Sequence, residues 1–145
     1  MSATAGSAGG SGLAERLGIK PGSAVLEIGY DSDDADEELR AAIVAQSGEE
    51  LLDADSDEVV DVVLLWWRDG DGDLVDTLVD AIGPLADHGA VWLLTPKVGR
   101  PGHVEPWDIS EAAPTAGLAE TRTLSVGRDW SGVRLAPPKA ARVKR

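Results

Sequence analysis

The chain has no cysteine and no phenylalanine among its 145 residues, and it has only one methionine. The lack of cysteine excludes disulfide bonds, thiolate catalysis and metal centres built on thiolates. No run of about 18 apolar residues occurs, so we expect no membrane-spanning helix. Residues 1–5 carry neither a basic segment nor an apolar stretch, which argues against a secretory signal. These absences favour a cytoplasmic protein that has no membrane partner.

Positive charge is scarce as well. Against 26 aspartates and glutamates the chain carries 13 lysines and arginines, which gives a formal net charge of −13. Four of the positive side chains lie in residues 139–145 and residues 1–12 carry none, so residues 13–138 carry a net charge of −17. Such a surface repels nucleic-acid phosphates and anionic membranes. We expect no nucleic-acid partner. A protein partner, a basic one in particular, fits this charge, and so does an acidic surface that serves only solubility.

Composition divides the chain into one domain and two tails. Apart from Met1, residues 1–12 are all glycine, serine, alanine or threonine, which predicts a disordered N-terminal tail. Residues 13–138 have the length of a single domain. Residues 139–145 form a basic C-terminal tail.

Apolar runs and amphipathic segments alternate within the domain. Buried strands are expected at 24–29, 59–67 and 90–94, with a C-terminal hairpin at 118–126 and 132–136. A further short strand is expected at 50–52. Helices are expected at 13–18, at 34–47 and at 108–113, where Asp108 and Glu111 have capping-box spacing. Another helix is expected after the N-cap Asp73, with an apolar face that reaches Leu85; Pro84 should kink or shorten its end, and 88–89 should close it. This order predicts an α/β fold with a small, mostly parallel Rossmann-like sheet, helices on both faces and an antiparallel hairpin.

The first strand ends at Gly29, the position where dinucleotide and adenosine sites begin a glycine-rich turn. In those sites the turn lets the backbone approach the cofactor closely. Here Tyr30, Asp31 and Ser32 follow, and no second or third glycine is present. The strand therefore ends like that of a nucleotide site but lacks the glycines that normally follow.

Several segments together resemble the class I S-adenosylmethionine-dependent methyltransferase fold; they are 19–22, 25–29, 60–64 and 85–93. More specific runs resemble an actinobacterial family catalogued as domain of unknown function 3052 (DUF3052); they are 25–31, 64–74, 94–97 and 129–132. The first resemblance implies a methyltransferase-like scaffold. In an active enzyme it would imply S-adenosylmethionine near Gly29, Asp31 and Asp69, with Trp67 as a wall of the pocket. The second resemblance implies no particular activity.

Two departures from the methyltransferase pattern indicate a degenerate cofactor site. The glycine-rich turn is missing, so side chains stand where backbone would approach the cofactor. Only residues 30–59 separate Gly29 from the strand at Val60, which is room for one strand–helix–strand unit. The resemblance implies two further strands there, the second carrying the acid that holds the ribose. We therefore expect no cofactor.

Ligands of open α/β sheets bind beyond the carboxyl ends of the strands, where three loops of this chain are expected to meet. The candidate ligand-binding residues in those loops are Tyr30, Asp31, Trp66, Trp67, Arg68, Asp69, Lys97, Arg100 and His103. Cations at such a point in an acidic domain indicate a small anionic ligand, a phosphate or a carboxylate. Charge balance with neighbouring acids explains the same cations. Two tryptophans in loops, Trp107 and Trp130, are candidates for a partner surface, with loop packing as the alternative.

No catalytic or metal-binding motif is evident. The histidines His88 and His103 fit no triad pattern, and no Gly-x-Ser-x-Gly elbow occurs. Residues 69–73 resemble the start of a calcium loop, but Leu74 occupies the position that needs glycine. The sequence thus favours a non-catalytic binding or regulatory domain that takes a small anion or a protein partner. The alternatives are an active S-adenosylmethionine-dependent methyltransferase with an atypical turn, and a small enzyme acting on a phosphorylated metabolite.

Overall fold

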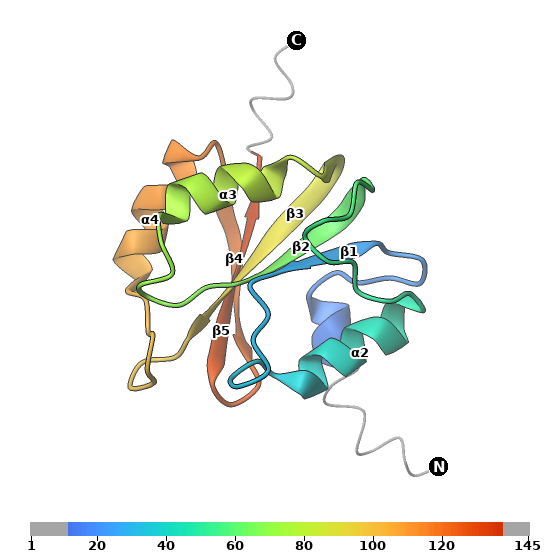
Figure 1. Cartoon of the computed structure of the whole chain (residues 1–145), viewed down its shortest axis with the longest axis horizontal. Helices are drawn as coiled ribbons and strands as arrows, with labels where there is room; N and C mark the ends of the chain where they lie inside the picture. The colour runs from blue at the N-terminus through green and yellow to red at the C-terminus, as the bar shows by residue number, and fades with distance from the viewer. Residues whose placement is uncertain (1–11, 138–145) are drawn as a thin grey trace.

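A computed structural model describes residues 12–137 and confirms the α/β fold (Figure 1). The strands are β1 (Val25–Ile28), β2 (Val60–Trp66), β3 (Leu85–Pro96), β4 (Ala119–Val126) and β5 (Trp130–Ala136). The helices are α2 (Glu37–Ser47), α3 (Leu74–Ile82) and α4 (Pro106–Thr115), and residues 12–16 form a further short helix. The two predicted tails lie outside the described residues, apart from Gly12.

The five strands form one mixed sheet in the order β1-β2-β3-β5-β4. The pairs β1–β2 and β2–β3 are parallel, whereas β3–β5 and β4–β5 are antiparallel. The C-terminal hairpin therefore adds to the sheet through its second strand, beside β3. This leaves β1 and β4 at the two edges.

Helices cover both faces of the sheet, as the near-continuous apolar run of β2 requires. On one face α3 and α4 pack against Val63, Leu65 and Trp67. On the other face α2 and the short helix pack against Val62, Leu64 and Trp66. Successive side chains of a strand point to opposite faces, so adjacent tryptophans serve different cores. None of the helices in residues 12–137 combines the length and apolarity needed to cross a bilayer.

The segment between α2 and β2 contributes one bridge to the sheet instead of the short strand expected at 50–52. The Leu52 N–H donates to the Val25 carbonyl (2.9 Å), and the Leu52 carbonyl accepts from the Glu27 N–H (2.7 Å), making a single parallel bridge to Leu26. The outer edge of β1 is therefore covered at one point only.

Several predicted element ends are wrong. The helix expected from residue 34 begins at Glu37, after the N-cap Asp36, whose side chain accepts from the Leu39 N–H. The chain leaves α3 after Ile82 and is extended from Leu85, because the Pro84 carbonyl accepts a hydrogen bond from the Val60 N–H and draws the chain into the sheet. In α4 the helix starts at Pro106, whose fixed φ suits the first helical position. Glu105 is the N-cap and makes no side-chain cap, so the predicted Asp108–Glu111 capping box does not form.

Candidate functional site

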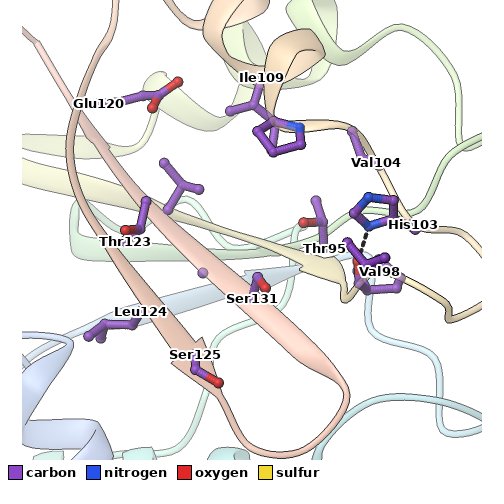
Figure 2. A pocket seen from close by; sticks show the side chains of 14 residues that line it. Thr95, Val98, His103, Val104, Ile109, Glu120, Thr123, Leu124, Ser125 and Ser131 are labelled. Atoms are coloured by element: carbon purple, nitrogen blue, oxygen red, sulfur yellow. Dashed lines mark hydrogen bonds between the residues drawn. The ribbon is translucent and has the colours of Figure 1, made fainter.

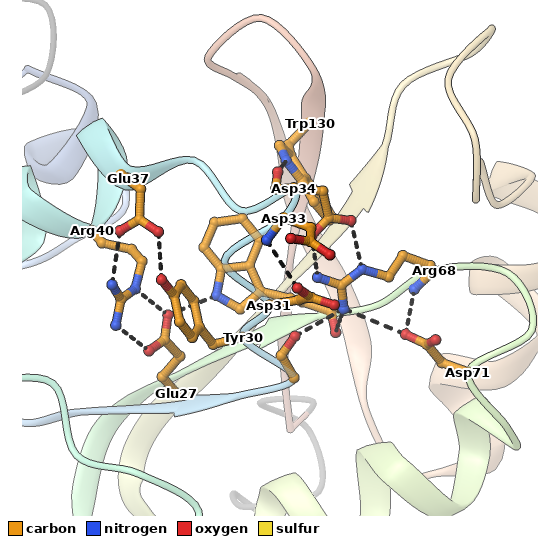
Figure 3. Close-up of polar contacts among 12 residues, drawn as sticks. Glu27, Tyr30, Asp31, Asp33, Asp34, Glu37, Arg40, Arg68, Asp71 and Trp130 are labelled. Atoms are coloured by element: carbon orange, nitrogen blue, oxygen red, sulfur yellow. Dashed lines mark hydrogen bonds and ion pairs between the residues drawn. The ribbon is translucent and has the colours of Figure 1, made fainter.

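Arg68 spans the loops that follow β1 and β2 (Figure 3). Its Nε and Nη2 donate to the two carboxylate oxygens of Asp34 at 2.9 and 2.7 Å, and its Nη1 donates to the Gly29 carbonyl at 2.8 Å. A third acid, Asp71, lies 3.5 Å from Nη1. The guanidinium also lies 5.3 Å from the centre of the Trp130 ring, whose Nε1 donates to the Asp34 carbonyl. We call Arg68, Asp34, Gly29 and Trp130 the Arg68 clamp.

Gly29 is required here by the neighbouring strand. Its φ is +80°, a conformation that side chains with a Cβ rarely adopt, and an added Cβ would overlap the Trp66 carbonyl oxygen. The glycine thus allows the Trp66 carbonyl of β2, and not a cofactor, to lie close to the backbone here.

A second polar network lies beneath the clamp, around Glu27 in the middle of β1. Its carboxylate accepts from Arg40 Nε and Nη2 at 2.7 and 2.9 Å and from Trp66 Nε1 at 2.8 Å. Glu27 is 8% exposed, so these partners compensate a buried charge. Arg40 also pairs with Glu37 and lies 3.8 Å from the centre of the Tyr30 ring.

These contacts shift the protonation equilibria in the directions that ion pairing requires. The hydrogen bond from Arg68 lowers the pKa of Asp34, and the same pair raises the pKa of Arg68. The hydrogen bond between Tyr30 and Glu37 raises the pKa of Tyr30 and lowers that of Glu37. The bond to Glu27 raises the pKa of Arg40.

Lys97, Arg100 and His103, predicted as cations in the loop after β3, have partners other than those of Arg68. Lys97 donates to the Gly127 carbonyl (3.1 Å), and Arg100 forms an ion pair with Asp129, so both bind the β4–β5 turn. His103 Nδ1 lies 2.9 Å from the Pro96 carbonyl, an acceptor, so this nitrogen carries the proton. Each of these cations has a local partner.

The remaining predicted residues are placed as follows. Asp31 closes its own turn, accepting from the Asp33 N–H at 2.9 Å, and the Asp69 N–H donates to the Gly102 carbonyl, which ties the second loop to the third. The indoles of Trp66 and Trp67 are both buried, on opposite faces. The structure therefore places Arg68 and the Gly29 carbonyl in the clamp and Tyr30 beside Arg40 in the second network, whereas Lys97 and Arg100 bind the β4–β5 turn.

The two candidate interface tryptophans differ. Trp107, in the first turn of α4, is 68% exposed. Trp130 is 2% exposed and packs edge-on against Trp66 with ring centres 4.8 Å apart, because its Nε1 is bound inside the clamp. For Trp130 the packing alternative therefore holds.

A cavity of about 380 Å³ lies between the β4–β5 hairpin and the loop that leads into α4 (Figure 2). Its lining is mostly apolar and includes Val98, Val104, Ile109 and Val133, with Glu120 at one side. Figure 2 shows His103 and Glu120 on different sides of this space. The geometry suits an apolar group more than a phosphate.

Within residues 12–137 no group of three or more histidine, aspartate and glutamate side chains is arranged to hold a metal ion. The acidic turn at 69–73 instead caps local backbone. Asp71 accepts from the Arg68 N–H, and Asp73 accepts from the Asp76 N–H as the N-cap of α3.

Sequence reasoning missed two residues that organise the site, Asp34 and Glu27. Asp34 looked like one of several acids in the first turn of a helix. Glu27 carried a usable signal, since a charged residue within the apolar run of β1 needs a buried partner.

Comparisons with known proteins agree with this architecture. A SAM-dependent methyltransferase from Aquifex aeolicus superposes with a TM-score of 0.62 at 15% identity, covering 87% of this chain and 88% of that one. A TehB-like SAM-dependent methyltransferase from Corynebacterium glutamicum gives a TM-score of 0.54 at 13% identity, with 89% and 88% covered. At such identities the likeness shows the fold alone.

Sequence relatives are much more similar. Uncharacterized proteins of Mycobacterium tuberculosis and Mycobacterium bovis are each 58% identical over 135 residues, which are 93% of this chain and 84% of theirs. The model of the family described as "Protein of unknown function (DUF3052)" matches residues 14–139, so the chain belongs to that family.

Proposed function

We propose that this chain is a non-catalytic binding domain with a methyltransferase fold, whose cofactor crevice is closed by its own side chains. The observation that supports the proposal is the Arg68 clamp, which lies across the carboxyl ends of β1 and β2. In open α/β sheets this is where ligands bind.

The clamp satisfies the groups that a ligand would use. Arg68 Nε, Nη1 and Nη2 all donate to protein acceptors, and both Asp34 oxygens are occupied. Bidentate arginine–carboxylate pairs are among the stronger hydrogen-bonded contacts in proteins. A cofactor would have to displace this pair and also pass the Tyr30 side chain.

Cofactor binding can be tested by thermal unfolding with and without S-adenosylmethionine or S-adenosylhomocysteine. A ligand at a hundred times its dissociation constant stabilises a fold by about 2.7 kcal/mol, which is a shift of several degrees in Tm for a domain of this size. We expect no shift at millimolar cofactor, with an active methyltransferase as the positive control. Equilibrium dialysis with labelled cofactor provides an independent reading. Saturable binding in either assay would favour the active-methyltransferase alternative.

The cavity beside α4 favours a protein as the bound partner. Trp107 follows Pro106, a lining residue, and Val98 at the mouth is 80% exposed. Exposed apolar side chains next to an apolar cavity are typical of interaction sites. Glu105 and Asp108 flank 106–107 in the sequence, Glu120 lines the cavity, and all three acids are exposed. We therefore propose a partner segment with one apolar anchor between basic residues.

A pair of labelled peptides tests this surface. One carries a leucine between lysines, and the matched peptide carries serine in place of the leucine. Fluorescence anisotropy should detect tighter binding of the leucine peptide, and Trp107→Ser should weaken it several-fold. Val79→Ser removes an exposed valine from α3, outside the cavity lining, and should change nothing. Equal binding of both peptides would contradict the anchor.

A further inference from the structure

A second cavity lies beside the amino ends of the parallel strands, whereas the Arg68 clamp lies at their carboxyl ends. It has a volume of about 410 Å³, and its lining includes Lys20, Arg134, His88 and Asp61. The segments that form it are the turn before β1, the start of β2 and the end of β5. It shares no residue with the Arg68 clamp, so it stands whether or not that crevice binds a cofactor.

The lining residue Arg134 faces a second arginine across the hairpin. Arg122 of β4 and Arg134 of β5 are direct partners in the antiparallel register, so both side chains lie on the same face of the sheet. Like charges directly opposite one another destabilise a sheet. Each guanidinium is held by a neutral oxygen, Arg122 by the Arg16 carbonyl at 3.1 Å and Arg134 by the Thr121 hydroxyl at 3.0 Å. The pair is therefore positioned without charge compensation.

Lys20, Arg122 and Arg134 share the lack of an acidic partner with Arg16, Lys97 and Arg128 among the described residues. Among the described residues, carboxylates form ion pairs with Arg40, Arg68 and Arg100, yet none does so with Lys20, Arg122 or Arg134. The surrounding domain carries a net charge of −17, so acids are abundant. What distinguishes Lys20 and Arg134 is that both line one cavity.

One carboxylate does belong to the cavity, and the structure gives it other partners. Asp61 accepts from the Ala24 N–H at 2.9 Å, and its second oxygen lies 3.1 Å from His88 Nε2. Its charge is thus directed to the backbone and to the histidine. Lys20 and Arg134 are the lysine and arginine of the lining, and neither is bound by Asp61.

The cavity has an apolar wall as well, formed by Leu17, Val62 and Ala90. We propose that it binds a small phosphate monoester, with the phosphate at Lys20 and Arg134 and the organic part against this wall. Arginine and lysine are the side chains that recognise phosphate, and the remaining N–H donors of Arg134 are free to make charge-assisted bonds. The volume is within the range of small-ligand sites.

Phenyl phosphate is a suitable probe because it carries both features. We expect isothermal titration calorimetry in phosphate-free buffer to show saturable binding, with inorganic phosphate binding more weakly and phenol not at all. The double variant Lys20→Gln/Arg134→Gln should weaken phenyl phosphate at least ten-fold. The matched variant Lys97→Gln/Arg100→Gln removes the same charge from the other edge of the sheet and should leave the affinity unchanged. Lys20→Glu, at an exposed position that no tertiary ion pair uses, gives a second variant that keeps the fold.

Four outcomes would overturn the proposal. Three are no saturable binding to the wild type, an equal loss in both double variants, and unchanged affinity after Lys20→Glu. The fourth is a loss confined to Lys97→Gln/Arg100→Gln, which would place the anion at the carboxyl ends of the parallel strands instead. Each of these results is independent of the S-adenosylmethionine assay, so failure here would leave the proposed closure of the crevice intact.

Discussion

At the scale of single residues, Gly29 illustrates how a position typical of cofactor sites serves packing. Its φ of +80° and its approach to the Trp66 carbonyl both demand the absence of a Cβ. We expect Gly29→Ala to lower the free energy of unfolding by ~1–3 kcal/mol beyond the cost of the backbone conformation alone, because the new methyl group forces the two strands apart. Urea unfolding followed by tryptophan fluorescence measures this.

Gly48→Ala is the matched control for that change. Gly48 has a φ of +78°, but an added Cβ would meet no atom within 4 Å. The control therefore carries only the cost of a left-handed conformation, about 1–2 kcal/mol. Equal losses in the two variants would mean that the contact with Trp66 is unimportant.

Glu27 gives a second prediction at this scale. Glu27→Gln removes the charge that compensates Arg40 and keeps an acceptor for Trp66 Nε1. Breaking this buried ion pair leaves Arg40 with Glu37, an exposed carboxylate, as its acidic partner, and we expect a loss of about 3 kcal/mol in denaturant unfolding. Glu37→Gln alters the exposed partner of the same arginine and should change stability little. If the two variants unfold alike, the buried pair contributes nothing special.

At the scale of elements, the clamp couples the loop after β1 to the end of β2 through one titrating group. Asp34 has a pKa below its ordinary value of 3.8 because Arg68 stabilises the carboxylate. Its contribution to stability is therefore complete above that ordinary value and is lost as the pH falls through the lowered pKa. We expect Asp34→Asn to flatten the acid limb of the stability–pH curve below about pH 4.

Unfolding by urea at several pH values between 2 and 6 would check this. Asp33→Asn is a neighbouring control, since the Asp33 side chain lies outside the clamp. The same flattening in both variants would assign the effect to general charge reduction.

Helix starts provide a further prediction. Asp73→Ala deletes the side-chain acceptor for the Asp76 N–H and should cost about 1 kcal/mol. Asp108→Ala removes an acid from the first turn of α4 that makes no cap, so only a dipole contribution of a few tenths of a kcal/mol is expected. Thermal unfolding distinguishes the two. A larger loss of thermal stability for Asp108→Ala than for Asp73→Ala would indicate that the capping box expected from the sequence does form.

Elements were predictable where one local pattern decided them. The apolar run at 59–67 became β2 because both faces of the central strand are covered, and Asp73 became the N-cap of α3. The end of α3 was not predictable from its apolar face, since the bond between the Val60 N–H and the Pro84 carbonyl joins segments distant in sequence. The same limit applies to the site. The loops could be predicted to meet, but the pairing of Arg68 with Asp34 depends on how the chain folds between Gly29 and α2.

At the scale of the whole molecule, opposite charges are distributed unevenly. Most acids face solvent. Arg68 and Arg100 form ion pairs in the loops at the carboxyl ends of the parallel strands. Near the amino ends lie Lys20 and the facing pair Arg122 and Arg134. The two ends of the parallel strands thus differ. At the carboxyl ends Arg68 and Arg100 are paired with carboxylates of the chain, and at the amino ends Lys20 and Arg134 form no ion pair among the described residues.

This excess of negative charge also predicts how the fold responds to salt. Because residues 13–138 carry −17, mutual repulsion among the acids opposes the compact state. Raising NaCl from about 10 mM to 1 M shortens the Debye length from about 30 to 3 Å, and we expect Tm to rise as that repulsion is screened. Tetramethylammonium chloride should act equally if screening is the cause, whereas a rise specific to sodium would indicate cation binding to the acidic surface. A Tm that falls with both salts would show that the ion pairs of Arg40 and Arg68 outweigh the repulsion. The sign of the change in Tm with salt concentration therefore decides whether attraction or repulsion between charges governs stability.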